Sequence, residues 1–318
     1  TRMKAQKQMP PRRSQPVSPL TAACLSLILL LSCYVVFAST RAEQRPAIFL
    51  LTAPSSDGVR PFEIAQPLYV GARAIGMGNA FTAMADDATA GFWNPAGLIQ
   101  GQGVKVFGMN KLFDRSEYGF DPKGIAYIYR ETAFFWGNKI ALGVPTRDPD
   151  YTYYALARQI GSYLAVGGSL KFQRRHPSDH YQVFGYNPAY DLALLTQPRP
   201  ALKIGLLLQN DQTDLSFERV TLGLAYRIQR QRSGLTFSLD LGLSGWSING
   251  KRILTRSLGV ELPVNDLFQL RVGNSNGDWT VGASLSYPFQ FTTVRLDYAW
   301  INDTLLHRSN FISAEITF

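Results

Sequence analysis

The chain has 318 residues, a length that suits two soluble domains or one large barrel. Its 32 Lys and Arg against 23 Asp and Glu give a formal net charge of +9. Six of the basic residues precede position 43, which leaves 26 basic and 23 acidic residues in the remainder. This near balance excludes a nucleic-acid-binding surface, which needs basic residues clustered on one face.

The first 42 residues have the organisation of a secretory signal. A basic, proline-rich stretch precedes Leu20–Phe37, which carries no charge, and small residues follow at Ala38, Ser39 and Ala42. This order predicts a signal peptide, residues 1–42, that is cleaved after export. An uncharged stretch of this length also suits a retained anchor helix, which is the alternative.

Both cysteines, Cys24 and Cys33, lie in the signal segment. Cys33 follows Leu30, Leu31 and Ser32, a loose match to a lipoprotein box, so lipidation at Cys33 is a second alternative. With residues 1–42 removed, the chain has no thiol for a disulfide or a thiolate metal site.

The remainder divides into three parts. Residues 43–70 are rich in proline and read as an extended arm, and residues 71–103 are rich in Gly, Ala and Asp. From residue 104 to 318, segments of eight to eleven residues alternate apolar and polar side chains between short turn-like clusters. A period of two predicts strands, and we count about fourteen of them, as in single-chain outer-membrane barrels.

Alternation of this kind fits a soluble barrel as well as a membrane barrel. In one segment Leu235, Phe237, Leu239, Leu241 and Leu243 share a face, and the opposite face carries mostly Thr, Ser and Gly. A soluble exterior normally carries many charges, whereas small polar residues suit a lumen. We therefore predict an all-β, transmembrane antiparallel β-barrel over residues 104–318, inserted in the outer membrane of a bacterium.

Aromatic residues and the last segment support the membrane barrel. Tyrosine, phenylalanine and tryptophan gather at strand ends, as interfacial girdles require, at Tyr151, Tyr153, Tyr154, Tyr287, Phe289 and Trp300. The final segment alternates in the same way and ends on Phe318. A terminal Phe on such a strand resembles the signal read by the outer-membrane assembly machinery.

The small-residue segment 71–103 suits a hatch inside the lumen, because small side chains allow tight turns against strand walls. Asn94-Pro95 favours a turn. Buried Asp86 and Asp87 would need partners, for which Lys203, Arg227, Arg271 and Arg295 on the polar strand faces are candidates. A periplasmic loop of the same composition is the alternative.

Two other interpretations of this segment are excluded. Gly76-Met77-Gly78 lacks the third glycine and the βαβ frame of a dinucleotide-binding loop. Asp86 and Asp87 lack a third convergent oxygen ligand, so they are more typical of turns or caps than of a metal site. We expect no metal and no cofactor.

The segment resembles the N-terminal hallmark of the PorV/PorQ proteins, within the wider group around the long-chain fatty-acid transporter FadL. The matching stretches are Gly71–Phe81, Ala85–Ala88 and Trp93–Leu98, with Gly259–Glu261, Leu270–Gly273, Asp297–Ala299 and His307-Arg308 further along the chain. The resemblance implies a barrel of about fourteen strands with an N-terminal lumenal hatch. The predicted hatch and lumen site consists of Gly71, Gly76, Gly78, Asp86, Asp87, Asn94, Pro95, Arg271, Arg295 and Asp297.

The sequence favours a protein that is not an enzyme. The three histidines, His176, His180 and His307, read as loop or turn residues without the serine and orienting group of a hydrolase. The PorV/PorQ resemblance implies an accessory barrel in export or surface attachment of proteins, with secretion-system proteins or exported cargo as partners. The alternative is FadL-like uptake of a hydrophobic small molecule. A plain diffusion porin ranks third, because a hatch leaves little water path.

Overall fold

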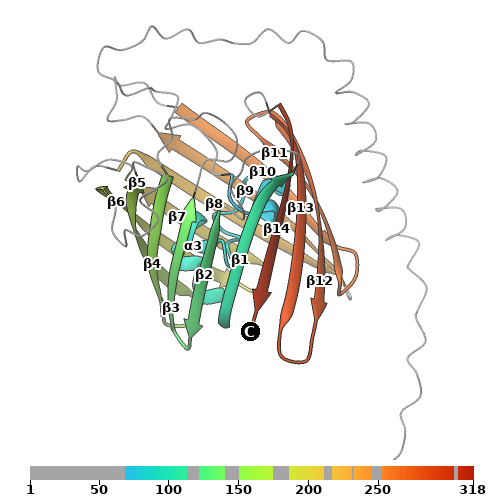
Figure 1. The fold of residues 1–318 in the computed structure, drawn as a ribbon, viewed down its shortest axis with the longest axis horizontal. Helices are drawn as coiled ribbons and strands as arrows, with labels where there is room; N and C mark the ends of the chain where they lie inside the picture. Colours follow the sequence, from blue (N-terminus) through green and yellow to red (C-terminus); the bar gives the residue numbers. More distant parts are fainter. Residues whose placement is uncertain are drawn as a thin grey trace, which may run out of the picture. The chain divides into compact units, whose positions relative to one another are not determined.

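The computed structural model describes residues 69–112, 122–139, 150–174, 186–210, 217–230, 233–244, 253–303 and 307–318. These ranges hold fourteen antiparallel strands that form a closed barrel, in which each strand pairs with its sequence neighbours and β14 closes on β1 (Figure 1). The strands are β1 (Gly103–Leu112), β2 (Lys123–Tyr129), β3 (Thr132–Lys139), β4 (Asp150–Ile160), β5 (Leu164–Arg174), β6 (Tyr186–Arg199), β7 (Leu202–Gln209), β8 (Arg219–Arg230), β9 (Ser233–Ser244), β10 (Ile253–Pro263), β11 (Phe268–Ser275), β12 (Asp278–Pro288), β13 (Thr293–Asp303) and β14 (His307–Thr317). The predicted fold class and strand number are confirmed.

The closing seam joins the two ends of the barrel segment. Lys105 pairs with Thr317, and the register continues to Leu112 opposite Asn310. Phe318 extends this seam, since its N–H donates to Val104 O at 2.8 Å. Because closure pairs every strand edge, no row of backbone groups is left unpaired toward lipid, where each orphan group costs several kcal/mol.

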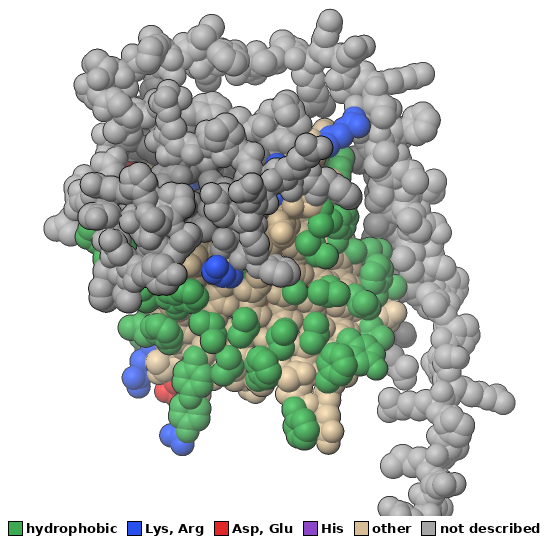
Figure 2. Space-filling model, in the orientation of Figure 1, with side chains coloured by type: hydrophobic (Ala, Val, Ile, Leu, Met, Phe, Trp, Pro, Cys, Tyr) green, Lys and Arg blue, Asp and Glu red, His purple; other side chains and the backbone are tan. Residues whose placement is uncertain are grey.

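The outer surface of the wall is apolar. Leu254, Leu156 and Leu285 are 62%, 61% and 50% exposed. Figure 2 shows hydrophobic side chains spread over the strand wall, with few charged side chains among them. A face this rich in exposed leucine suits hydrocarbon rather than water.

The inner face carries the small and polar residues that alternate with these. On β9 the inward Ser238, Asp240 and Ser244 are buried, while Phe237 and Leu241 face outward. The predicted assignment of faces holds here, and it holds for β14, where Ser313 and Glu315 are buried. Among the described residues, no helix is long and apolar enough to cross a membrane.

One residue of the predicted aromatic girdle faces the other way. Tyr153 is only 5% exposed and packs inside the barrel beside Ala155 and Ala157. Successive strand residues point to opposite faces, so Tyr153 and its neighbour Tyr154 cannot both face lipid. The expectation that Tyr153 belongs to the girdle was wrong.

The two ends of the barrel differ. Short connections such as Arg130-Glu131, between β2 and β3, and Gly161–Tyr163, between β4 and β5, lie at the end that also holds Phe318. We call this the turn end and the opposite one the loop end. In bacterial outer-membrane barrels the short turns face the periplasm.

Residues 69–100 lie inside the barrel, as predicted for a hatch, and not below it as a loop. Three short elements form within them: α2 (Ala72–Gly76), α3 (Ala90–Trp93) and η1 (Pro95–Gln100). Almost every residue from Val70 to Leu98 is buried. α2 packs on β11–β14, whereas α3 and η1 pack mainly on β3–β6 (Figure 1).

Candidate functional site: the hatch and its seat

Glycines on the inner wall bring the hatch backbone directly onto the strands. A Cβ on Gly273 of β11 would lie 2.1 Å from the nitrogen of Gly78, and one on Gly259 of β10 would lie 2.4 Å from Met77 O. A Cβ on Gly76 would lie 3.0 Å from the Cα of Gly282 of β12. No larger side chain fits at these contacts, so the wall is shaped to this segment.

The seat continues around the barrel to β5. A Cβ on Gly223 of β8 would lie 2.8 Å from Ala83 N, and one on Gly205 of β7 would lie 2.6 Å from Thr82 O. A Cβ on Gly167 of β5 would lie 2.4 Å from Ala96 N. Six strands thus touch hatch backbone through a glycine. We call these six wall glycines, together with Gly76 and Gly78, the glycine seat.

Barrel side chains satisfy the backbone groups of α2. Gly71 N donates to Met109 Sδ at 3.0 Å, and Ala72 N donates to Ser313 Oγ at 3.1 Å. At the other end of the helix, Thr280 accepts from Gly78 N and donates to Gly76 O. The first N–H groups of a helix have no partner within it, so the wall supplies the caps that a five-residue helix cannot supply itself.

Arg73 of α2 is the centre of a buried ionic network. Its guanidinium donates to both oxygens of Glu261, at 3.0 and 3.2 Å, and also contacts Asp86 and, at 3.3 Å, Asp87. The same guanidinium lies 5.2 Å from the ring centroid of Phe81, within range of a cation–π contact. A buried charge needs such partners, because leaving one unpaired costs several kcal/mol.

The network extends into the wall through Arg271 and Arg295. Arg295 contacts Asp87 at 3.1 Å and Asp297 at 2.9 Å, and Arg271 contacts Glu261 at 2.6 Å and Asp297 at 3.4 Å. Glu315 joins through Arg295, at 3.4 Å, and accepts the N–H of Ala88. The network thus consists of three guanidinium groups and five carboxylates, shared between the hatch and β10–β14, and we call it the hatch latch. Its members are Arg73, Asp86, Asp87, Glu261, Arg271, Arg295, Asp297 and Glu315.

Electrostatics hold Asp87 in its charged form. Burial acts to raise the pKa of this carboxyl, but the guanidinium groups of Arg295 and Arg73 outweigh it and keep the pKa below its ordinary value. The hydroxyl of Thr89 also donates to it, at 2.5 Å. The carboxylate is therefore ionised at every physiological pH.

A single carboxylate on β9 holds the middle of the hatch. Asp240 Oδ2 accepts from Phe81 N at 3.0 Å and from Thr82 N at 2.8 Å. The side chain reaches these groups beside Gly223, where a Cβ would lie 2.8 Å from Asp240 Oδ1. Thr82 N thereby gains its acceptor, and Phe81 N, which also donates to Asn79 O at 3.0 Å, gains a second one.

Asn94 ties the hatch to itself and to the wall. Its side-chain N–H group donates to Thr82 O at 2.8 Å and to Leu194 O at 3.3 Å, and its oxygen caps η1 by accepting from Ala96 N at 3.1 Å. Pro95 occupies the first position of η1, where a proline is favoured. The predicted turn at Asn94-Pro95 is the N-cap of η1.

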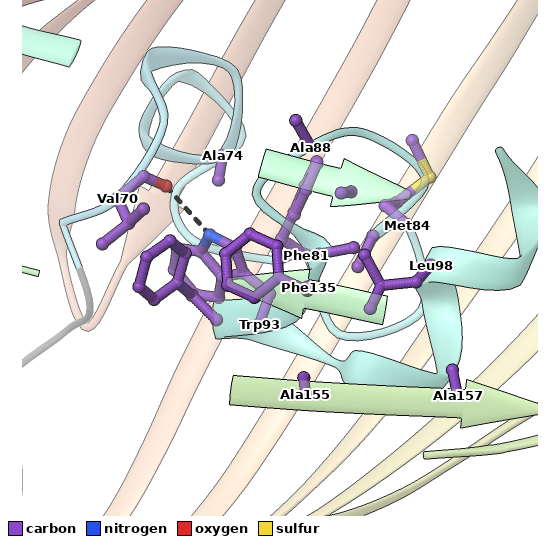
Figure 3. Packing of buried hydrophobic residues seen from close by; sticks show 14 of the residues in the cluster. Val70, Ala74, Phe81, Met84, Ala88, Trp93, Leu98, Phe135, Ala155 and Ala157 are labelled. Carbon is purple, nitrogen blue, oxygen red and sulfur yellow. Dashed lines mark hydrogen bonds between the residues drawn. The ribbon is translucent and has the colours of Figure 1, made fainter. Parts of the chain in front are cut away.

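On the opposite side the hatch contacts the wall through apolar and aromatic side chains. Phe92 packs edge-on against Phe107, Phe135 and Tyr153, with ring centroids 5.9, 5.0 and 4.7 Å away. Figure 3 shows the neighbouring hatch residues, where Trp93 Nε1 donates to Val70 O at 2.9 Å. These residues form one buried cluster with Phe81, Met84, Leu98 and Ala126, which we call the aromatic cluster.

The predicted site residues lie in the glycine seat, in the hatch latch, before α2 and, for Asn94 and Pro95, at the start of η1. Gly76 and Gly78 lie in the glycine seat, and Gly71, with φ of +83°, precedes α2. Asp86, Asp87, Arg271, Arg295 and Asp297 meet in the hatch latch. Lys203 and Arg227, which were candidate partners of the aspartates, instead line a cavity beside Asp86.

Sequence reasoning missed the role of Arg73, Glu261 and Asp240. The available signal was position: Glu261 and Asp240 are carboxylates on inward strand faces, and Arg73 is the one cation between Gly71 and Phe81. In the part of the chain that the structure describes, no group of His, Cys, Asp and Glu is arranged to hold a metal. His176 and His180 lie outside the described residues.

Comparisons with known proteins define the fold. No family profile and no curated protein sequence matches this chain. Among solved structures, a FadL homologue from Pseudomonas aeruginosa superposes with a TM-score of 0.50 at 11% identity, over 76% of this chain and 97% of that one. This match shows the fold alone, a closed antiparallel β-barrel like that of the FadL homologue.

Two further solved structures align less closely. The outer-membrane protein Omp33 of Acinetobacter baumannii has a TM-score of 0.47 and 8% identity, over 68% of this chain and 98% of that one. The toluene transporter TodX of P. putida has a TM-score of 0.42 and 13% identity, over 72% and 92%.

Proposed function

We propose that this chain is an outer-membrane barrel for uptake of a hydrophobic small molecule, with residues 69–100 as the hatch that closes its lumen. The aromatic cluster carries the proposal. A diffusion porin has a polar, water-filled interior, whereas here Phe92, Phe107, Phe135 and Tyr153 pack together inside the barrel. An apolar ligand would exchange contacts with such rings at little desolvation cost.

The proposed location is the bacterial outer membrane with the turn end in the periplasm. The apolar exterior and the short turns at one end support it. Export by a signal peptide over residues 1–42, lipidation at Cys33 and assembly through Phe318 remain predictions of the sequence. The arm over residues 43–68 lies outside the described residues.

The test is purification of the protein from native outer membranes, followed by mass spectrometry of both copurified proteins and extracted small molecules. A stoichiometric apolar ligand is expected, at a level well above that of an unrelated barrel from the same membranes. Phe92→Ala would reduce its occupancy, because it removes the ring at the centre of the cluster. Absence of any enriched apolar compound would overturn the proposal.

A second candidate is an accessory barrel of PorV/PorQ type that holds or exports proteins. The resemblance of Gly71–Phe81 and Trp93–Leu98 to that family supports it, and so does the glycine seat, since a hatch fitted this closely to six strands suits a permanently closed barrel. Stoichiometric protein partners without an apolar ligand in the same purification would favour this role.

A further inference from the structure

A cavity of about 530 Å³ opens at the turn end and meets the aromatic cluster only at Met84 and Ala225. The hatch forms its roof with Arg73, Met84, Asp86 and Gln100, and β6–β11 with their turns form its walls. We call this cavity the turn-side vestibule. The wall residues are Gln197, Pro200, Ala201, Lys203, Ala225, Arg227, Gly234, Thr236, Glu261, Pro263 and Gln269.

The carboxylates of the vestibule are already paired. Both oxygens of Glu261 accept from Arg73, and one also accepts from Arg271 at 2.6 Å. Asp86 accepts from Arg73. Both carboxylates therefore contact guanidinium groups of the hatch latch, and among the described residues neither Lys203 nor Arg227 contacts a carboxylate.

Arg227 is positioned by a glycine on the neighbouring strand. A Cβ on Gly234 of β9 would lie 2.6 Å from Arg227 Nε, so the guanidinium lies against backbone where any other residue would displace it. Within the described residues, Arg227 has no carboxylate partner. Its N–H groups are available to a molecule in the vestibule.

Lys203 is oriented by a short chain of hydrogen bonds. The side chain of Gln100 donates to Ala85 O at 2.9 Å, which leaves its oxygen to accept from Lys203 Nζ. That contact uses one of three ammonium donors. Lys203 thus keeps its charge and its remaining donors at the cavity wall.

A wall amide adds to this surplus of donors. Gln269 accepts from Arg271 Nη2 at 2.7 Å through its side-chain oxygen, so its N–H group is left as a donor. Gln269, Lys203 and Arg227 all line the same cavity. Cationic side chains with spare N–H groups are the chemistry that recognises carboxylate and phosphate oxygens.

We propose that the turn-side vestibule binds the oxyanion, carboxylate or phosphate, of a small soluble molecule between Lys203 and Arg227, with Gln269 as a further donor. A cavity of this size holds a metabolite rather than a folded domain. The proposal goes beyond uptake of a hydrophobic molecule, because it assigns a polar ligand to the opposite side of the hatch. It does not depend on what the aromatic cluster contacts.

The test uses the purified full chain, folded in a non-ionic detergent at low ionic strength and titrated separately with inorganic phosphate and with succinate by calorimetry. Saturable binding of at least one is expected. Lys203→Gln and Arg227→Gln should each weaken it at least tenfold, and Arg227→Lys should weaken it less than Arg227→Gln. The matched control is Arg130→Gln, which removes an exposed cation at the same end but outside the vestibule.

The two titrants distinguish the chemical sources. Binding of phosphate alone assigns a phosphorylated ligand, and binding of succinate alone assigns a carboxylate. Absence of saturable binding with both, or equal loss in Arg130→Gln, would overturn the proposal. A parallel measurement guards against misfolded variants: saturating titrant should raise the melting temperature of the unsubstituted protein and of Arg130→Gln, but not of Arg227→Gln.

Discussion

Replacing Arg73 by Met tests the hatch latch most directly. Met keeps the unbranched stem and removes the charge of a side chain that is 9% exposed and contacts three carboxylates. Removing one partner of a buried ion pair costs about 3–5 kcal/mol. Glu261 keeps Arg271 and Asp87 keeps Arg295, and Asp86 is 32% exposed, so the lower end, about 3 kcal/mol, is expected.

The assay is urea unfolding in detergent micelles, followed by tryptophan fluorescence and by the mobility of unheated samples on gels. Trp93, buried in the hatch, reports on this segment. In a double-mutant cycle, Arg73→Met and Glu261→Gln should couple by about 1–3 kcal/mol, as residues in one network do. Arg130→Met is the control at an exposed site. If Arg73→Met changed the free energy of unfolding no more than this control, the latch would not hold the hatch.

Three further predictions follow from the hatch contacts. Gly273→Ala places a Cβ 2.1 Å from Gly78 N and should lower the free energy of unfolding by about 1–3 kcal/mol in the same assay. The control Gly168→Ala, whose Cβ has its nearest atom at 3.2 Å, should lower it much less. Equal losses in the two variants would refute the idea that the wall glycines are required by the hatch. Asp240→Ala leaves the N–H group of Thr82 without its acceptor, at about 1–3 kcal/mol, whereas Phe81 N keeps Asn79 O. Limited proteolysis should therefore cut the hatch faster in Asp240→Ala than in the control Ser238→Ala. Equal cutting rates in the two variants would show that Asp240 does not hold the hatch. The lowered pKa of Asp87 means that its stabilisation is complete above its unfolded pKa of about 3.9 and is lost as the pH falls below that value toward the folded pKa. Stability measured from pH 6 to pH 3 should therefore fall less steeply in Asp87→Asn, and parallel curves would contradict this assignment.

The barrel was predictable because alternation is a local property. On β9, the period of two decides that Phe237 and Leu241 face outward and that Ser238 and Asp240 face inward, without reference to any other strand. The glycine-rich composition of residues 71–103 likewise limits them to a place where backbones approach closely. Both inferences use short stretches of sequence, and both hold in the structure.

The partners within the site were not predictable in the same way. Arg73 and Glu261 are 188 residues apart, and their contact depends on the depth at which α2 lies against β10. Strand alternation gives the face of a residue but not its height along the barrel. For that reason the four candidate cations for Asp86 and Asp87 could not be ranked. Arg295 contacts Asp87, whereas Arg271 contacts Glu261 and Asp297 instead. Lys203 and Arg227, on the same inward faces, lie nearer the turn end and line the vestibule.

The hatch is held by different forces on its two sides. Toward β5–β14 it is fixed by the glycine seat, by Asp240 and by the hatch latch, whose hydrogen bonds tolerate little displacement. Toward β1–β4 it meets the aromatic cluster, where contact energy depends on buried area rather than on direction. Small displacements of the hatch therefore cost less along the aromatic side than along the polar side. Because an apolar molecule can replace ring contacts but cannot replace an ion pair, the proposed uptake would pass the hatch on the side facing β1–β4 while the latch stays closed.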